Sequence, residues 1–381
     1  MHFEIDYYDK HRVRWDWAVD QKKQFIWKTN LLGGGRLFHL VYRLSLLETL
    51  GEFIDEKKTS NPKWEFEVGY ETGKPALPKL IPYLHLQDRV SSIDKNGTVN
   101  SIDVENNMYF YRPKFEHLFK PPLIIIKKKI GNSFLPIAII KEYKRDYLVF
   151  NNRYLGIHAP NTHINELENI YKYIETNESF CRFWILVQSP NTMINQETSF
   201  IKEDLETLPF IEHGKYMEFN EDEKIIKKDI LNYYIHLGKA ITKKHDGYIL
   251  HQPVSELIEL EEFGKIYCDV LNEIYAEDGK SWQVGEVLQT PTFISYQLGF
   301  GKDGGLQYDF KEDAEKDFNS LLDNVKSNSG IHYKRIIRHY QHVNGYDCIY
   351  LIKPNARRYW LQSIALRDAD DTFMDLKKNG Y

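Results

Sequence analysis

The middle of the chain carries two short, uninterrupted apolar runs with proline and glycine on either side. They are residues 123–126 (LIII) and residues 135–140 (LPIAII), separated by Gly131-Asn132. β-Branched runs of this length between turn-forming residues favour buried strands over helices. The sequence therefore predicts two paired strands in a hairpin that turns at Gly131-Asn132.

Apolar residues elsewhere recur at steps of three and four, which is the spacing of amphipathic helices. This spacing predicts helices over residues 37–47, 165–186 with a break near Asn177, 222–244 and 257–275. The C-terminal part predicts strands over residues 292–298 and 347–354, an acidic helix over 312–322 and a final helix over 357–378. Residues 61–107 are rich in turn formers, and Asn96-Gly97 predicts a type I′ hairpin between Ile93 and Val99.

Together these elements predict an α+β protein with four parts. The parts are an N-terminal arm and helix (1–60), a small mixed β domain with covering helices (61–215), a helical spacer (216–284) and a small C-terminal α/β module (285–381). Hydrophobic residues make up 42% of the chain and charged residues 28%, which is ordinary for a globular protein with proper cores.

Positive charge gathers at the ends of the two predicted strands. Lys127, Lys128 and Lys129 close the first strand, and the second is followed by Lys141, Lys144 and Arg145. Such clusters suit contacts with DNA phosphates, and lysines also blunt exposed strand edges against aggregation. Because the net charge is −5, any contact with nucleic acid must come from a local patch.

Residues 109–156, which contain both strands, resemble the target-recognition region of bacterial N6-adenine DNA methyltransferases of restriction-modification systems. In that family a proline-rich lead-in precedes an apolar strand ending in Lys or Arg, then a second strand and a Gly-Ile step. Residues 150–157 (FNNRYLGI) resemble the segment before the family's helix, and residues 200–210 (FIKEDLETLPF) resemble its closing element. The resemblance adds Asn151, Asn152 and Arg153 to the predicted DNA-binding residues.

The catalytic half of such a methyltransferase is missing from the sequence. The family needs an Asn/Asp-Pro-Pro-Tyr/Phe step to hold the flipped adenine, whereas the Pro121-Pro122 pair here has Lys120 before it and Leu123 after it. The resemblance therefore implies a specificity subunit that binds double-stranded DNA and acts with a separate methyltransferase or nuclease, in restriction-modification or a related phage defence. We expect no cofactor, no metal and no catalytic residue in this chain.

Other motifs keep two further functions open, a nuclease or phosphodiesterase and a structural assembly subunit. His332 and Lys334 match half of a phospholipase-D-type signature whose acidic position holds His339, and Glu142 with Lys144 matches the tail of a metal-dependent nuclease core. Gly299–Gly304 spells G-x-G-x-x-G, but no convincing helix pattern follows it, so a glycine-rich hairpin is favoured over a dinucleotide loop.

Cysteine usage and hydropathy indicate the compartment. Cys181, Cys268 and Cys348 are odd in number and far apart, so they predict neither a disulfide framework nor a cysteine zinc site and fit a reducing cytoplasm. No run of 18 apolar residues is present, so no membrane contact is expected.

The predicted final helix carries aromatic residues that have two possible uses. Tyr359, Trp360 and Phe373 present apolar bulk, flanked by charges of both signs. They would either close the core of the C-terminal module or anchor a protein partner as an interface hot spot. The sequence leaves both uses open.

Overall fold

A computed structural model gives the fold and confirms that the protein belongs to the α+β class. It describes residues 14–19, 25–32, 34–61, 63–71, 88–103, 115–130, 134–192, 199–212, 217–234, 249–328 and 336–381. Contacts between Cα atoms divide these residues into two compact units. We call the described part of 13–29 and 38–219 the central unit, and the described part of 30–37 and 220–381 the C-terminal unit.

The central unit is built on a four-stranded antiparallel sheet. Its strands, in spatial order, are β1 (Glu65–Val68), β6 (Tyr154–His158), β4 (Leu123–Lys127) and β5 (Ile137–Ile140). The predicted pairing of the two apolar runs is confirmed, because β4 and β5 pair antiparallel from Leu123 opposite Ile140 to Ile126 opposite Ile137. The predicted turn at Gly131-Asn132 lies outside the described residues.

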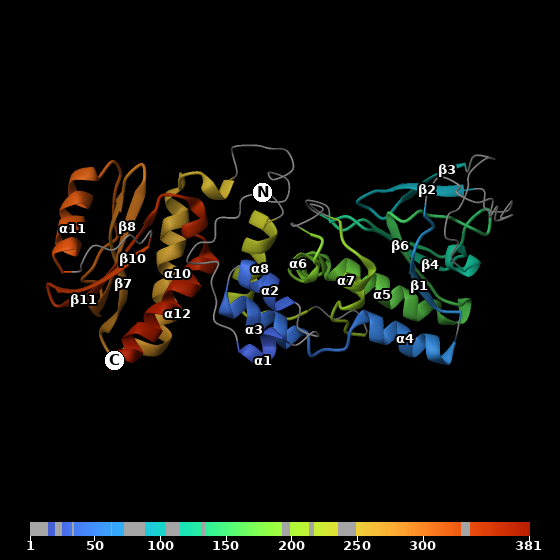
Figure 1. The fold of residues 1–381 in the computed structure, drawn as a ribbon, viewed down its shortest axis with the longest axis horizontal. Helices are drawn as coiled ribbons and strands as arrows, with labels where there is room; N and C mark the ends of the chain where they lie inside the picture. Colours follow the sequence, from blue (N-terminus) through green and yellow to red (C-terminus); the bar gives the residue numbers. More distant parts are fainter. Residues whose placement is uncertain are drawn as a thin grey trace. The chain divides into compact units, whose positions relative to one another are not determined.

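Strand β4 is covered on both faces, which explains its unbroken apolar sequence. All four side chains from Leu123 to Ile126 are fully buried. Leu123 and Ile125 pack in a cluster with Val90 and Phe150, and helix α5 (Ile164–Thr176) packs against β4 and β5 from the other side (Figure 1). A strand buried on both faces has no reason to alternate polar and apolar residues.

The hairpin predicted around Asn96-Gly97 is present, but the predicted turn type is wrong. Strands β2 (Asp88–Ile93) and β3 (Val99–Asp103) pair antiparallel. A type I′ turn needs positive φ at both central residues, whereas here Gly97 has φ +74° and Asn96 is not in the left-handed region. Asp94 instead closes a longer loop, since its side chain accepts from the backbone of Asn96 and Thr98.

The predicted break near Asn177 is confirmed. Helix α5 ends at Thr176 and α6 (Glu178–Gln188) begins after Asn177. The Asn177 side chain donates to the Tyr173 carbonyl and accepts from the Met217 amide, so it holds the junction in place.

The segment with the KEDL sequence forms the short helix α7 (Lys202–Glu206), and the Asp204 carboxylate caps its start by accepting from the Ile201 amide. The backbone after α7 pairs with the start of α4 (Leu50–Ser60) through the Leu50 amide and the Leu208 carbonyl. In the described residues before α4, the chain forms helices α1 (Trp15–Ala18), α2 (Phe25–Leu32) and α3 (Gly35–Leu44).

The C-terminal unit contains the helices of the predicted spacer as well as the C-terminal module. Helix α10 (Leu257–Tyr275) matches its prediction. The helix predicted over residues 222–244 is α-helical in α8 (Glu221–Asp229) and continues as a π-helical turn (Ile230–Tyr234). Its remaining residues, from 235 on, lie outside the described part of the chain.

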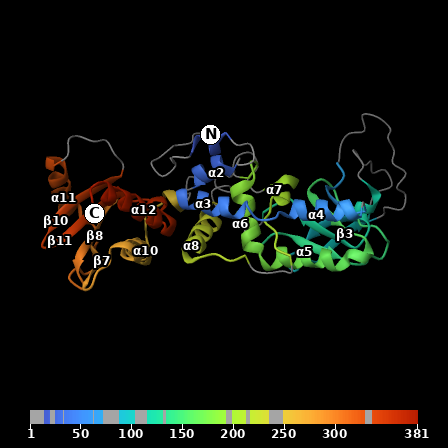
Figure 2. The same cartoon turned by 90° about the horizontal axis from the view of Figure 1, so that it is seen from below.

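A five-stranded sheet forms the core of this unit. Its spatial order is β10 (Ile337–Val343), β11 (Tyr346–Pro354), β8 (Phe293–Lys302), β7 (Lys280–Gln289) and β9 (Asp309–Lys311), antiparallel except for β7 with β9. Helices α10 and α12 (Gln362–Lys378) lie side by side on one face, and α11 (Glu315–Asn328) covers the other (Figure 1; Figure 2). The sequence anticipated β8 and β11 but not β7, β9 and β10.

A buried cluster of charges joins the sheet to α12 in the C-terminal unit. Lys353 and Asp368 are both fully buried and form an ion pair, and the Lys353 ammonium also donates to the Tyr359 carbonyl at 2.8 Å. Arg338 donates to Asp368 at 2.6 Å and to Asp371 at 2.9 Å. Burial lowers the pKa of Lys353, and the Asp368 carboxylate opposes that shift.

No helix in the described part of the chain is long and apolar enough to cross a membrane.

Candidate nucleic-acid interface and a histidine-lined pocket

The structure places the two predicted lysine clusters at opposite ends of the β4–β5 hairpin. Lys127 lies opposite Tyr154 at one end, while Lys141 follows Ile140, which lies opposite Leu123 at the other end. Four residues of strand separate the two ends, about 13 Å. Antiparallel pairing separates the two clusters, because β4 and β5 end at opposite ends of the hairpin.

The cluster after β5 is neutralised by acids of the same unit. Lys141 pairs with Glu168 of α5 at 2.5 Å. Arg145 pairs with Asp88 at 2.8 Å and Asp103 at 2.9 Å, and Lys144 lies 3.8 Å from Asp88. The pairs with Asp88 and Asp103 tie the loop after β5 to the β2–β3 hairpin. All of these pairs compete with any phosphate for the same cations.

The cluster at the end of β4 is arranged differently, and we call Lys127, Lys128, Lys129 and Arg153 the basic edge. The Lys128 amide donates to the Arg153 carbonyl at 2.8 Å, so the two segments are direct neighbours. Lys127, Lys129 and Arg153 have no acidic partner within 4 Å among the described residues. Partial burial lowers the pKa of Lys128, while Glu203 and Asp204 of α7 act in the opposite direction.

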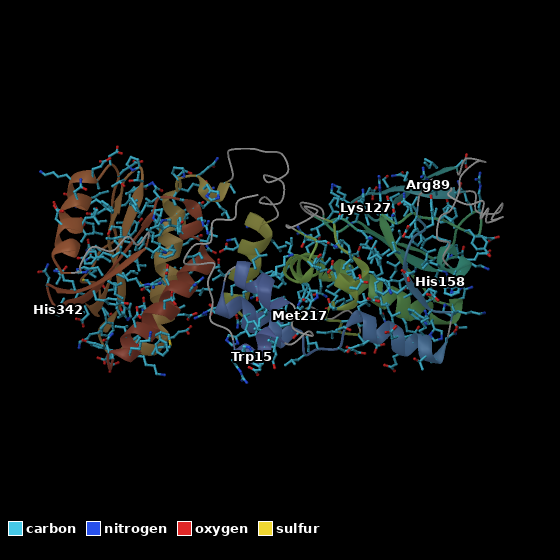
Figure 3. The ribbon with its side chains drawn as sticks, in the orientation of Figure 1. Trp15, Arg89, Lys127, His158, Met217 and His342 are labelled. Atoms are coloured by element: carbon cyan, nitrogen blue, oxygen red, sulfur yellow. The ribbon has the colours of Figure 1, made fainter. Side chains whose placement is uncertain are left out.

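Asn151 and Asn152 form the turn that carries Arg153. The Asn151 side chain accepts from the Arg153 amide at 3.1 Å, and the Asn152 amide donates to the Tyr70 carbonyl at 2.7 Å. The Asn152 side chain is exposed beside Arg153. Because Tyr154 follows Arg153 and pairs with Lys127, these predicted residues lie at the same end of the sheet as Lys127, which is labelled in Figure 3.

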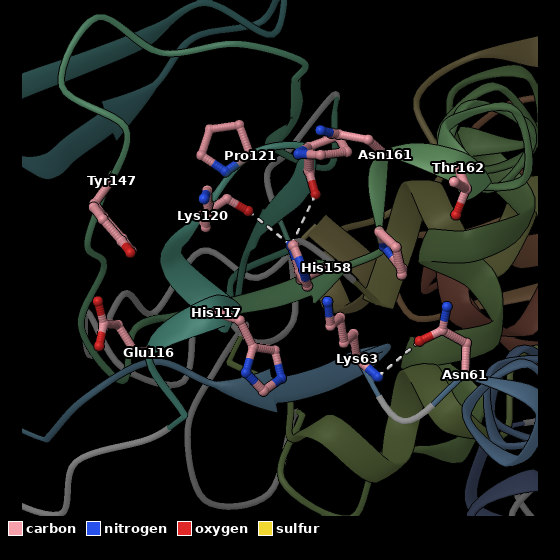
Figure 4. A pocket seen from close by; sticks show the side chains of 12 residues that line it. Asn61, Lys63, Glu116, His117, Lys120, Pro121, Tyr147, His158, Asn161 and Thr162 are labelled. Carbon is pink, nitrogen blue, oxygen red and sulfur yellow. Dashed lines mark hydrogen bonds between the residues drawn. The ribbon is translucent and has the colours of Figure 1, made fainter.

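A polar pocket of about 710 Å³ lies at the other end of the same sheet. Its walls come from the residues after α4, the short 3₁₀ helix η3 (Glu116–Phe119), the start of β4 and the end of β6. Figure 4 shows Glu116 and Tyr147 on one side, Asn161 and Thr162 on the other, and His158 between them.

His158 is held in one orientation by backbone carbonyls. It is 5% exposed, and its Nδ1 lies 2.7 Å from the Lys120 carbonyl and 3.1 Å from the Pro122 carbonyl. Carbonyls only accept hydrogen bonds, so Nδ1 carries the proton and Nε2 of the neutral ring is an acceptor. Burial lowers the pKa of His158 to about 4, which keeps the ring neutral at pH 7.

A second histidine and a buried acid lie next to His158. The His117 and His158 ring centroids are 5.6 Å apart, and Glu65 lies opposite His158 on β1. The Glu65 carboxylate accepts from Lys58 at 3.1 Å and lies 3.6 Å from His117 Nε2. That nitrogen has no hydrogen-bond partner among the described residues.

The residues of the alternative enzymatic functions are not assembled into a site in the described part of the chain. No group of three or more His, Cys, Asp or Glu side chains there could hold a metal ion. Glu142 is exposed, and Lys144 lies close to Asp88. His339 lies on strand β10, whereas His332 and Lys334 lie outside the described residues. Gly299 and Gly301 belong to strand β8, where the ring of Tyr346 occupies the space beside Gly301.

The aromatic residues proposed for partner binding differ in exposure. Trp360 is 2% exposed, its ring packs edge-on against Phe263 at 5.1 Å, and its Nε1 donates to the Pro354 carbonyl. Tyr359 is also buried, whereas Phe373 is partly exposed. Burial of Trp360 and Tyr359 supports the core use, one of the two that the sequence left open.

Comparison with known proteins identifies no relative. No family model matches the chain, and no match was found among curated proteins or among solved structures. The pocket residues were missed in the sequence because His117 and His158 lie in segments far apart, and each sits beside apolar residues like an ordinary core histidine. Only pairing of β1, β4 and β6 brings them together.

Proposed function

We propose that the protein is a DNA target-recognition subunit that binds duplex DNA through the basic edge of its central unit. The observation that supports this proposal most is the set of three cations, Lys127, Lys129 and Arg153, with no acidic partner within 4 Å among the described residues. Cations that are not committed to internal ion pairs can exchange their counterions for DNA phosphates at little cost.

The two lysine clusters, which carry the same charge in the sequence, differ in how many of their cations face acids. Only the cluster at the end of β4 retains cations without described acidic partners, since the cluster after β5 is paired with Glu168, Asp88 and Asp103. Asn152 directly precedes Arg153 of the basic edge, both side chains are exposed, and both are of the types that read base edges. Phosphate contacts from the lysines would position the duplex for such readout.

The chemistry would be supplied by a partner. The chain resembles recognition regions of N6-adenine methyltransferases but lacks their Asn/Asp-Pro-Pro-Tyr/Phe motif. We therefore propose that it acts in the cytoplasm with a separate methyltransferase or nuclease, in a restriction-modification or related defence complex. The purified chain is expected neither to methylate nor to cut DNA when it is supplied with Mg²⁺ and a labelled methyl donor.

Matched double variants test the DNA-binding proposal in the full-length chain. Lys127→Ala/Lys129→Ala removes two cations of the basic edge, and Lys141→Ala/Lys144→Ala removes the same charge from the other end of the hairpin. Fluorescence anisotropy with a mixed-sequence duplex over a range of salt concentrations gives the slope of log affinity against log salt. The edge variant should lower the magnitude of that slope by about 2, because each phosphate contact contributes about 0.9.

The control should change the slope by much less, since Lys141 and Lys144 already face carboxylates. Equal losses in both variants would mean that the protein's general charge attracts DNA. An unchanged slope in the edge variant would remove the basic edge from the DNA interface and leave edge protection as its role.

A further inference from the structure

The histidine-lined pocket combines features of a site for a phosphorylated ligand. Its volume of about 710 Å³ falls in the range of small-molecule sites, about 300–1,000 Å³. It lies at the opposite end of the central sheet from the basic edge, because His158 pairs with Leu123 whereas Lys127 pairs with Tyr154. It is therefore independent of the proposed DNA interface.

Two lysines give the pocket its positive charge. The side chains of Lys63 and Lys120 line it, and neither has an acidic partner within 4 Å among the described residues. The acids nearby are engaged, Glu65 with Lys58 at 3.1 Å and Glu116 with the hydroxyl of Tyr147. The Tyr147 hydroxyl is neutral, so Glu116 keeps its negative charge, and an anion entering the pocket would meet two ammonium groups and one carboxylate that already accepts a hydrogen bond.

The interior of the pocket offers several hydrogen-bonding groups, and one of them, His158 Nε2, is fixed as an acceptor. His158 Nε2 is an acceptor in a ring oriented by the Lys120 and Pro122 carbonyls. Asn161 and Thr162 also line the pocket (Figure 4), and their side chains can donate or accept. A bare inorganic anion would leave this acceptor unused, so a ligand with both an anionic group and hydroxyl or amino donors fits better.

An exposed aromatic ring stacks on His117, one of the residues that line the pocket. Phe115 is 67% exposed, and its ring stacks on His117, with centroids 5.6 Å apart and an interplanar angle of 22°. Large exposed aromatic rings beside a polar pocket are suited to stacking with a nucleobase.

We propose that this pocket binds a nucleotide through its phosphate monoester, with Lys63 and Lys120 at the phosphate, His158 Nε2 at a hydroxyl or amino donor, and Phe115 beside the base. The phosphate monoester is the shared chemistry of two sources, a free mononucleotide and the 5′-phosphate end of a DNA strand.

Calorimetric titration of the full-length chain tests the proposal with four probes: AMP, adenosine, and one short duplex with and without a 5′-phosphate. AMP or the phosphorylated duplex should bind at least about tenfold more tightly than its unphosphorylated counterpart, because two ammonium groups contact the phosphate. The arm that shows the difference identifies the source. If neither phosphorylated probe binds more tightly than its unphosphorylated counterpart, the proposal is overturned.

Variants locate the binding. Lys120→Ala should weaken AMP or the phosphorylated duplex about tenfold and leave the unphosphorylated probe unchanged, whereas Lys95→Ala, an exposed lysine in the β2–β3 turn, should have no effect. Phe115→Ala should weaken the nucleotide but not inorganic phosphate. Equal effects of Lys120→Ala and Lys95→Ala would overturn the assignment. The Lys127→Ala/Lys129→Ala variant should keep AMP binding, so failure of the DNA proposal is distinguishable from failure of this one.

Discussion

The buried ion pair of Lys353 and Asp368 predicts an asymmetry between its two halves. Both side chains are fully buried, but each has different further partners besides the other. Asp368 also accepts from Arg338 at 2.6 Å, so it keeps a cation when Lys353 is removed. Lys353 keeps the Tyr359 carbonyl and the faces of Phe263 and Trp360, at 4.3 Å and 4.5 Å, when Asp368 is removed.

We therefore expect Asp368→Asn to lower the free energy of unfolding more than Lys353→Met. Removing one partner of a buried pair typically costs about 3–5 kcal/mol, because the remaining charge is left without compensation. Asp368→Asn leaves both Lys353 and Arg338 in a site that has lost its central carboxylate, so it should reach that range. Lys353→Met fills the same volume and leaves Asp368 with Arg338, so about 1–3 kcal/mol is expected.

The double variant Lys353→Met/Asp368→Leu sharpens this prediction. It removes both charges and replaces them with apolar side chains, and Arg338 still has Asp371 at 2.9 Å. Its loss should be smaller than that of Asp368→Asn alone, since replacing a buried pair by apolar groups is often close to neutral. A coupling free energy of this sign is expected for residues that interact directly or within one ion-pair network.

Hydrogen exchange measured by mass spectrometry reports the loss locally. Because the chain has two compact units, one global unfolding curve need not describe either unit, whereas amides of α10 and α12 report the stability around the pair. The control is Lys265→Met with Asp269→Asn, an exposed pair on α10 at 3.0 Å that should contribute under about 0.5 kcal/mol. A larger loss for Lys353→Met than for Asp368→Asn would refute the asymmetry, and additive losses in the double variant would refute the coupling between the two residues.

Two further predictions concern single buried side chains. Trp360→Ala should destabilise the C-terminal unit by about 3–5 kcal/mol, because the ring is 2% exposed. Phe373 is partly exposed, so Phe373→Ala should cost less. An unchanged melting temperature of Trp360→Ala would instead favour a partner-binding role. The stability of wild type relative to His158→Asn should fall as the pH drops from about 6.5 to 4, by about 3 kcal/mol in total. The unfolded chain takes up the proton first because burial lowers the folded pKa of His158 to about 4, and a flat difference across that pH range would show that the ring is not buried neutral.

The sequence by itself determined those elements whose signal is local. The apolar runs at 123–126 and 135–140 gave paired strands, the three- and four-residue spacing gave α10 with its bounds, and Asn177 marked the break between α5 and α6. In each case the residues that carry the pattern are also those that are buried. Strands β7 and β10 gave no such signal. The irregularity between Val284 and Val287 breaks the period-two pattern along β7, and β10 lies at a sheet edge and consists mostly of polar and charged residues (IRHYQHV).

Only the tertiary structure decided which charges lie together and which are already paired. The lysines after β4 and β5 look equivalent in the sequence, yet antiparallel pairing sends them to opposite ends of the hairpin, and only folding brings Glu168 to Lys141 and Asp88 to Arg145. The proximity of His117 to His158 likewise depends on the pairing of β4, which follows the η3 helix that carries His117, with β6. The sequence shows which residues are charged and how they are spaced. Whether a charged side chain forms an ion pair depends on contacts between distant segments, which no local pattern specifies.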